Sequence, residues 1–116
     1  MSGSYDELAR GVGQQKTLQC VSFIMSKVAR KFVVRGEVQG VGYRFFAMRA
    51  AARHQVVGYV RNCPDGSVEA LVEGPANSVE AFKHDLATGP QWSVVTQLEE
   101  LNIDPTGRYS SFRIER

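Results

Sequence analysis

Strand-like and helix-like hydrophobic patterns follow one another in a definite order from residue 31 to the C-terminus. Residues 31–38 are rich in Val and Phe and predict a strand. Residues 43–54 combine Phe, Met and Ala with interleaved arginines, which predicts a helix with one broad apolar side. Two further strands are predicted over 56–63 and 67–73, and the Pro64-Asp65-Gly66 between them suits a tight turn.

A second helix and two more strands complete the pattern. After the break at Gly74-Pro75, apolar residues recur at helical spacing as far as Gly89-Pro90, which ends the helix. Strands are predicted again over 92–102 and 111–115. The order is therefore β-α-β-β-α-β with an extra terminal strand. We expect an α+β, ferredoxin-like sandwich, in which two helices cover one face of an antiparallel sheet.

The chain of 116 residues is long enough for one domain with a buried core. Its net charge is only +2, and the excess lies in residues 1–30, because residues 31–116 carry ten basic and ten acidic side chains. This nearly equal number of basic and acidic side chains disfavours a nucleic-acid coat or a polybasic membrane binder, because both need a concentrated basic surface. Residues 1–30 show no sustained period, so we expect a flexible N-terminal extension there and the folded domain over 31–116.

The cysteines and histidines lack the spacing of metal ligands. Cys20 and Cys63 are expected as thiols of a cytoplasmic protein, and His54 and His84 have no companion ligand nearby in the chain. The sequence also shows no apolar stretch long enough to span a membrane and no signal peptide. We expect a cytoplasmic monomer that holds no metal at these residues and binds neither membrane nor nucleic acid.

The segment from Gly36 to Arg44 joins the first predicted strand to the first predicted helix and is rich in glycine. Glycines let backbone N–H groups approach an anion closely, and a helix N-terminus adds unpaired N–H groups. Arg44 supplies a forked cation suited to two phosphate oxygens. The spacing matches neither the Walker motif nor the dinucleotide fingerprint. It indicates either an anion site of phosphate size or a plain glycine-rich connection with a surface arginine.

Two stretches of the chain resemble the two signatures of the acylphosphatase family. Residues 36–44 read Gly-Glu-Val-Gln-Gly-Val-Gly-Tyr-Arg and are similar to G-x-V-Q-G-V-x-[FY]-R. Residues 58–62 read Gly-Tyr-Val-Arg-Asn and, with Gly66, Val68 and Gly74, resemble the second signature. The resemblance covers residues 31–116. It implies a ferredoxin-like fold and hydrolysis of acyl phosphates to carboxylate and inorganic phosphate, without a metal or organic cofactor.

The resemblance also implies roles for particular residues. Arg44 would bind the phosphate, and Asn62 would position the attacking water. Backbone groups of the loop would complete the phosphate site, and these belong to Gln39, Gly40, Val41, Gly42 and Tyr43. An acyl phosphate already has a good leaving group, so positioning and charge neutralisation are the main tasks that remain for the protein.

Other interpretations of the same residues stay open. A non-catalytic anion-binding or regulatory module could use the same fold, since one fold hosts many functions. An RNA-recognition domain is disfavoured, because the strand over 67–73 has no aromatic residue for base stacking. Arg35 and Arg61 are expected on the surface of strands. Three aromatic residues near the glycine segment are expected in the core rather than against substrate: Tyr43, Phe45 and Phe46.

Overall fold

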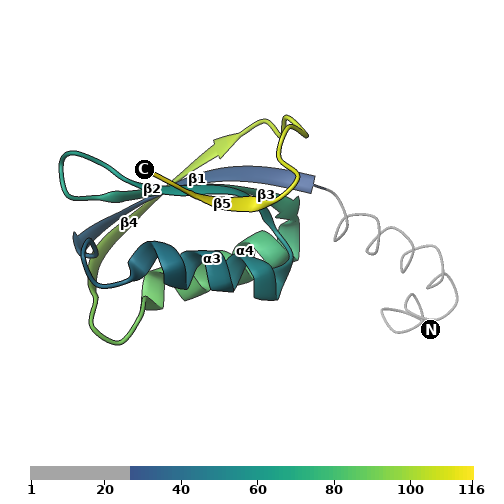
Figure 1. Cartoon of the computed structure of the whole chain (residues 1–116). Helices are drawn as coiled ribbons and strands as arrows, with labels where there is room; N and C mark the ends of the chain where they lie inside the picture. Colours follow the sequence, from purple (N-terminus) through teal and green to yellow (C-terminus); the bar gives the residue numbers. More distant parts are fainter. Residues whose placement is uncertain (1–26) are drawn as a thin grey trace, which may run out of the picture.

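A computed structural model describes residues 27–116. Over this range the chain forms five strands and two helices (Figure 1). In chain order these are β1 (Lys27–Glu37), α3 (Tyr43–His54), β2 (Val57–Asn62), β3 (Val68–Pro75), α4 (Ala76–Thr88), β4 (Val94–Ile103) and β5 (Phe112–Glu115). The order and type of every element agree with the sequence prediction.

The five strands form one sheet in the order β4-β1-β3-β2-β5. β1 pairs antiparallel with both β3 and β4, and β2 pairs antiparallel with β3. The extra strand β5 instead pairs parallel with β2, so the sheet is mixed rather than wholly antiparallel. The reason is topological, because the chain leaves β4 at one edge, crosses the end of the sheet and runs back in the opposite direction along the other edge (Figure 1).

The core lies between the sheet and the two helices, which cover the same face (Figure 1). Alternate residues of β3 point into it, and Val68, Ala70 and Val72 are fully buried, as period-two alternation requires. The fully buried side chains of Phe32 on β1 and Phe82 on α4 pack with ring centroids 6.4 Å apart and ring planes tilted by 47°. Burial of a side chain of this size contributes about 1.5–3 kcal/mol to stability.

β1 begins at Lys27, within the range predicted as an N-terminal extension, so the ordered strand starts earlier than residue 31. The rest of that extension, residues 1–26, lies outside the described residues. From Lys27 onward the structure contains no helix long and apolar enough to cross a membrane.

Candidate active site

The loop between β1 and α3 owes its shape to glycine. Gly40 and Gly42 both have φ of 78°, a left-handed conformation that costs other residues energy. A Cβ on either glycine would meet no atom within 4 Å, so conformation and not crowding demands glycine here. Gly42 is the N-cap of α3, and no side chain caps the first turn. The amides at this helix start are therefore of the kind that bind anions.

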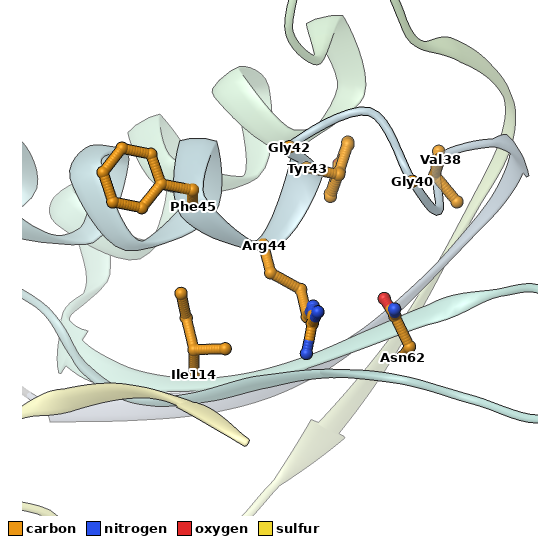
Figure 2. Close-up of a pocket in the computed structure, with 8 residues that line it drawn as sticks. All are labelled: Val38, Gly40, Gly42, Tyr43, Arg44, Phe45, Asn62 and Ile114. Carbon is orange, nitrogen blue, oxygen red and sulfur yellow. The ribbon is translucent and has the colours of Figure 1, made fainter. Parts of the chain in front are cut away.

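An open pocket of about 170 Å³ lies beside this loop. Its lining residues come from the loop, the start of α3, the end of β2 and strand β5, and they are Val38, Gly40, Gly42, Tyr43, Arg44, Phe45, Asn62 and Ile114. Figure 2 shows the guanidinium of Arg44 and the carboxamide of Asn62 facing one another across this space. Two residues that are far apart in the sequence thus share one pocket.

Among the described residues that line the pocket, Arg44 has the only charged side chain. Its Nη1 donates a hydrogen bond of 3.2 Å to the backbone carbonyl oxygen of Glu115 at the end of β5. This bond orients the guanidinium and uses only one of its five N–H donors. Because no residue of the range 27–116 that lines the pocket carries a carboxylate, an anionic ligand would meet one cation and no opposing charge from this part of the chain.

Asn62 is the last residue of β2 and pairs with Val68 on β3. The turn that follows is closed by two backbone bonds, from Cys63 N to Ser67 O at 2.8 Å and from Gly66 N to Cys63 O at 3.1 Å. Strand pairing on one side and the closed turn on the other fix the backbone of Asn62, from which its side chain projects. The thiol of Cys63 is free and half-buried.

Asp65 reinforces the same turn. Its Oδ1 accepts hydrogen bonds from the backbone N–H and the hydroxyl of Ser67, at 3.0 and 2.6 Å. Its Oδ2 accepts a bond of 3.0 Å from Nη1 of Arg35. The bonds from Ser67, together with the Arg35 guanidinium, lower the pKa of the Asp65 carboxyl to about 2. The side chain is consequently a charged acceptor at any moderate pH.

The predicted loop residues divide into two groups in space. Gly40, Gly42 and Tyr43 line the pocket together with Arg44 and Asn62. Gln39 and Val41 do not. Val41 packs against the core, and the carboxamide of Gln39 reaches the β2–β3 turn.

The expectation for Phe45 is wrong. Its side chain is 51% exposed and lines the pocket, because residues two positions apart do not share a helix face and Tyr43 lies on the buried one. Tyr43 is buried, as predicted, and its ring contacts that of Phe46. Sequence reasoning also missed Ile114, whose strand had no predicted partner and therefore no predicted position at the pocket.

The strand arginines behave as expected and pair with acidic neighbours. Arg61 bonds to Glu69 on β3 at 3.3 Å, and Arg35 bonds to Glu99 on β4 at 3.2 Å as well as to Asp65. Neither lines the pocket. Within residues 27–116, no group of three or more His, Cys, Asp or Glu side chains is arranged to hold a metal ion.

Comparison with known proteins decides the family. The family model described as Acylphosphatase matches residues 30–114. A protein of Solibacter usitatus called Acylphosphatase is 45% identical over 93 residues, covering 80% of this chain and 96% of its own length. Another from Moorella thermoacetica is 44% identical over 90 residues, covering 78% and 96%. The chain belongs to the acylphosphatase family.

Solved structures lead to the same result for the fold. The crystal structure of acylphosphatase from Bacillus subtilis is similar with a TM-score of 0.74 and 32% identity, over 77% of this chain and 99% of that one. The family, the ferredoxin-like α+β fold and the class of enzyme, a hydrolase acting on acyl phosphates, are thereby confirmed.

Proposed function

We propose that this chain hydrolyses acyl phosphates in the pocket beside the β1–α3 loop, with Arg44 and the loop amides holding the phosphoryl group and Asn62 orienting the attacking water. The observation that carries the proposal is the shared pocket, in which a lone cation and a carboxamide face one another (Figure 2). The volume of about 170 Å³ suits a phosphoryl group with part of its acyl substituent.

Opposite charge and N–H donors would hold the phosphoryl group. Its oxygens would accept hydrogen bonds from the Arg44 fork and from amides of the glycine loop and the first turn of α3. These donors are held before substrate arrives, Arg44 by the Glu115 carbonyl and the loop by its own backbone conformation. Donors fixed in this way stabilise developing charge without the cost of reorganisation.

The chemical step needs no strong base. Water oxygen bonds to phosphorus while the bond from phosphorus to the carboxyl oxygen breaks, which releases carboxylate with the bonding electron pair. Asn62 accepts a hydrogen bond from the water and sets its direction, but an amide does not take up a proton. The water proton passes to an oxygen of the phosphoryl group, since the described lining residues offer no free base. Tyr43, the titratable side chain there besides Arg44, keeps its proton in a hydrogen bond of 2.6 Å that it donates to the Leu86 carbonyl. The products are carboxylate and inorganic phosphate.

Substitution of the two side chains tests the proposal. Arg44→Ala and Asn62→Ala should each lower the kcat for hydrolysis of a simple acyl phosphate such as acetyl phosphate by about 10²–10³-fold. Arg44→Ala removes a donor to the transition state, and Asn62→Ala removes the group that orients the attacking water. Arg44→Ala should also weaken competitive inhibition by inorganic phosphate, whereas Asn62→Ala should leave that inhibition nearly unchanged. The difference arises because only Arg44 is proposed to touch the phosphoryl group.

Matched variants control for the loss of a side chain elsewhere. Arg49→Ala removes an exposed guanidinium from the same helix, where it lies 5.4 Å from the ring centroid of Phe45. Asn102→Ala removes an exposed carboxamide from the edge strand β4. Both controls should keep kcat within about twofold of wild type, as for most surface substitutions. Wild-type turnover in Arg44→Ala or Asn62→Ala would show that the assignment is wrong, and tight phosphate binding without turnover would favour the non-catalytic module.

A further inference from the structure

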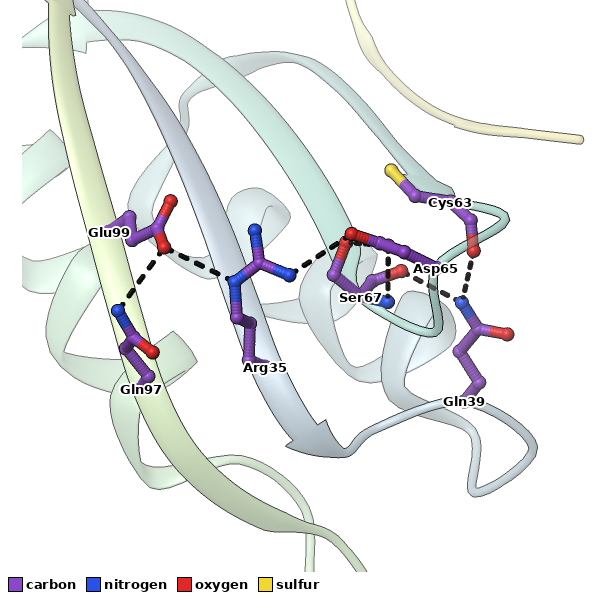
Figure 3. Close-up of polar contacts among 7 residues, drawn as sticks. All are labelled: Arg35, Gln39, Cys63, Asp65, Ser67, Gln97 and Glu99. Carbon is purple, nitrogen blue, oxygen red and sulfur yellow. Dashed lines mark hydrogen bonds and ion pairs between the residues drawn. The ribbon is translucent and has the colours of Figure 1, made fainter.

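The side chain of Gln39 forms a bridge between two halves of the pocket. Its Nε2 donates one hydrogen bond of 2.8 Å to the carbonyl oxygen of Cys63 and another of 2.8 Å to that of Ser67 (Figure 3). Gln39 belongs to the loop that leads into Arg44, and Cys63 directly follows Asn62. One carboxamide thus links the segment that would hold phosphate to the hairpin that would hold water.

The bridge is separate from the turn itself. Both carbonyls that Gln39 contacts already accept a backbone bond, Cys63 O from Gly66 and Ser67 O from Cys63. A carbonyl oxygen has two lone pairs, so the Gln39 bonds add to the turn bonds without replacing them. Removal of the carboxamide should therefore leave the hairpin closed but detach it from the loop.

A second contact reaches the same turn from the opposite side (Figure 3). Arg35 on β1 bonds to Asp65 at 3.0 Å, but the two side chains are 40% and 55% exposed. Exposed ion pairs contribute little to stability, and salt weakens them further. The two Gln39 bonds are part-buried, and their acceptors are the carbonyl oxygens of Cys63, directly after Asn62, and of Ser67, directly before β3. Gln39 is thus the stronger of the two anchors.

On these grounds we infer that Gln39 is a positioning residue, whose carboxamide sets the distance and angle between the Asn62 side chain and a phosphoryl group held by the loop and Arg44. The inference rests on the proposed function and extends it from loop backbone to one loop side chain. An error of about 1 Å in the placement of reacting groups can cost up to about 10²-fold in rate. The Gln39 carboxamide points to the β2–β3 turn, and Gln39 is not among the described residues that line the pocket.

The main test substitutes Gln39 by a side chain of similar length that cannot donate. Gln39→Met should lower kcat for acetyl phosphate by about 10-fold or more, while the inhibition constant of inorganic phosphate stays within about threefold of wild type. A merely structural role would change both quantities or neither. Gln97→Met is the matched control, because the exposed Gln97 donates a comparable bond to Glu99 on the outer strand, away from the turn. It should behave as wild type.

A double-mutant cycle gives the sharper result. In the Asn62→Ala background, Gln39→Met should lower kcat by less than about threefold, because no water-orienting carboxamide remains to be misplaced. Fully independent effects, or a Gln39→Met enzyme with wild-type kcat, would overturn the inference.

A second substitution keeps the test decisive if Gln39→Met folds poorly. Gln39→Glu preserves shape but presents a carboxylate to two carbonyl oxygens, and protonation of that carboxylate restores one donor. The kcat of Gln39→Glu relative to wild type should therefore rise as pH falls from about 7 to about 5, since a carboxyl beside carbonyl oxygens has a raised pKa. A flat ratio would count against the bridge.

NMR tests the placement of the Asn62 side chain without an activity assay. The side-chain NH₂ resonance of Asn62 should shift in Gln39→Met and stay in place in Gln97→Met. An unchanged resonance would overturn the inference whether or not the protein hydrolyses acetyl phosphate. Absence of hydrolysis by the wild-type chain would instead overturn the proposed function.

Discussion

At the scale of single residues, Tyr43 shows how one hydroxyl supports the start of α3. The side chain is 2% exposed, and its hydroxyl donates a hydrogen bond of 2.6 Å to the carbonyl oxygen of Leu86 near the end of α4. The usual helical donor to that carbonyl would be residue 90, which is Pro90 and has no N–H. Burial raises the pKa of the Tyr43 hydroxyl, so it remains a donor. Tyr43 thus ties the two helices together directly beneath the pocket loop.

Tyr43→Phe should therefore lower the free energy of unfolding by about 1–3 kcal/mol, because the Leu86 carbonyl would lose its donor in a buried place. Urea denaturation followed by circular dichroism measures this. The comparison variant is Tyr109→Phe, whose half-buried ring packs beside Tyr59 with centroids 6.2 Å apart. Tyr109→Phe should lower the free energy of unfolding by less than about 1 kcal/mol. An equal decrease in the free energy of unfolding in the two variants would show that the bond from the Tyr43 hydroxyl to the Leu86 carbonyl does not stabilise the fold.

At the scale of elements, the β2–β3 hairpin connects stability to the site. Asn62 stands at its end, and Asp65 in the turn receives three hydrogen bonds, from the Ser67 N–H, the Ser67 hydroxyl and Arg35. These bonds favour the charged carboxylate and hold its pKa at about 2, against an ordinary value of 3.8. The same groups that order the turn therefore make its stability sensitive to acid.

The direction of this acid sensitivity follows from proton binding. Between pH 3.8 and about 2 the unfolded chain takes up a proton at residue 65 that the folded protein does not. The free energy of unfolding therefore decreases as the pH is lowered through that window, and above it the Asp65 carboxylate makes its full contribution to stability. Asp65→Asn should flatten the dependence, and its stability deficit relative to wild type should shrink as pH approaches about 2. Urea titrations from pH 2 to 6 test this. Asp104→Asn, beyond the end of β4, is the control, and a wild-type acid dependence in Asp65→Asn would contradict the assignment.

At the scale of the whole molecule, the C-terminal strand completes a pocket that the other strands leave open. β5 brings Ile114 to the lining and the Glu115 carbonyl to Arg44. The segment that carries β5 across the sheet is anchored on Glu73, which is 2% exposed and accepts bonds from Thr106 N, Thr106 Oγ1 and Gly107 N. Burial alone would raise the pKa of Glu73, but these bonds lower it below its ordinary value.

Glu73→Ala should consequently loosen β5 more than the rest of the sheet. Hydrogen bonds to a charged group contribute about 1.5–3 kcal/mol each, and those amides would lose a shared acceptor. Hydrogen exchange should accelerate at the amides of Arg113 and Glu115, which face β2 in the parallel ladder, more than at those of β1 and β3. Glu80→Ala, which removes a 70% exposed carboxylate 3.8 Å from Lys83, should leave the exchange pattern unchanged. Uniform acceleration would indicate global destabilisation instead.

Much of this architecture could be predicted because it depends on patterns among residues that are close together in the sequence. The period of two in β3 and the helical spacing before Gly89 depend only on neighbouring residues, so the element order was predictable. The glycines at 40 and 42 were informative for the same reason, since a positive φ is a property of one residue. The two motifs likewise indicated the family before any contact was known.

The sequence by itself therefore determined which elements form, which segments carry the motif residues and which family the chain resembles. Only the tertiary structure decided that β5 runs parallel to β2, that Phe45 faces the pocket and that the Gln39 carboxamide reaches the turn. The physical reason is distance along the chain. The Gln39 contact joins residues 24 positions apart and the Arg44–Glu115 contact joins residues 71 apart, and such pairs meet only once the sheet has brought its edges and ends together.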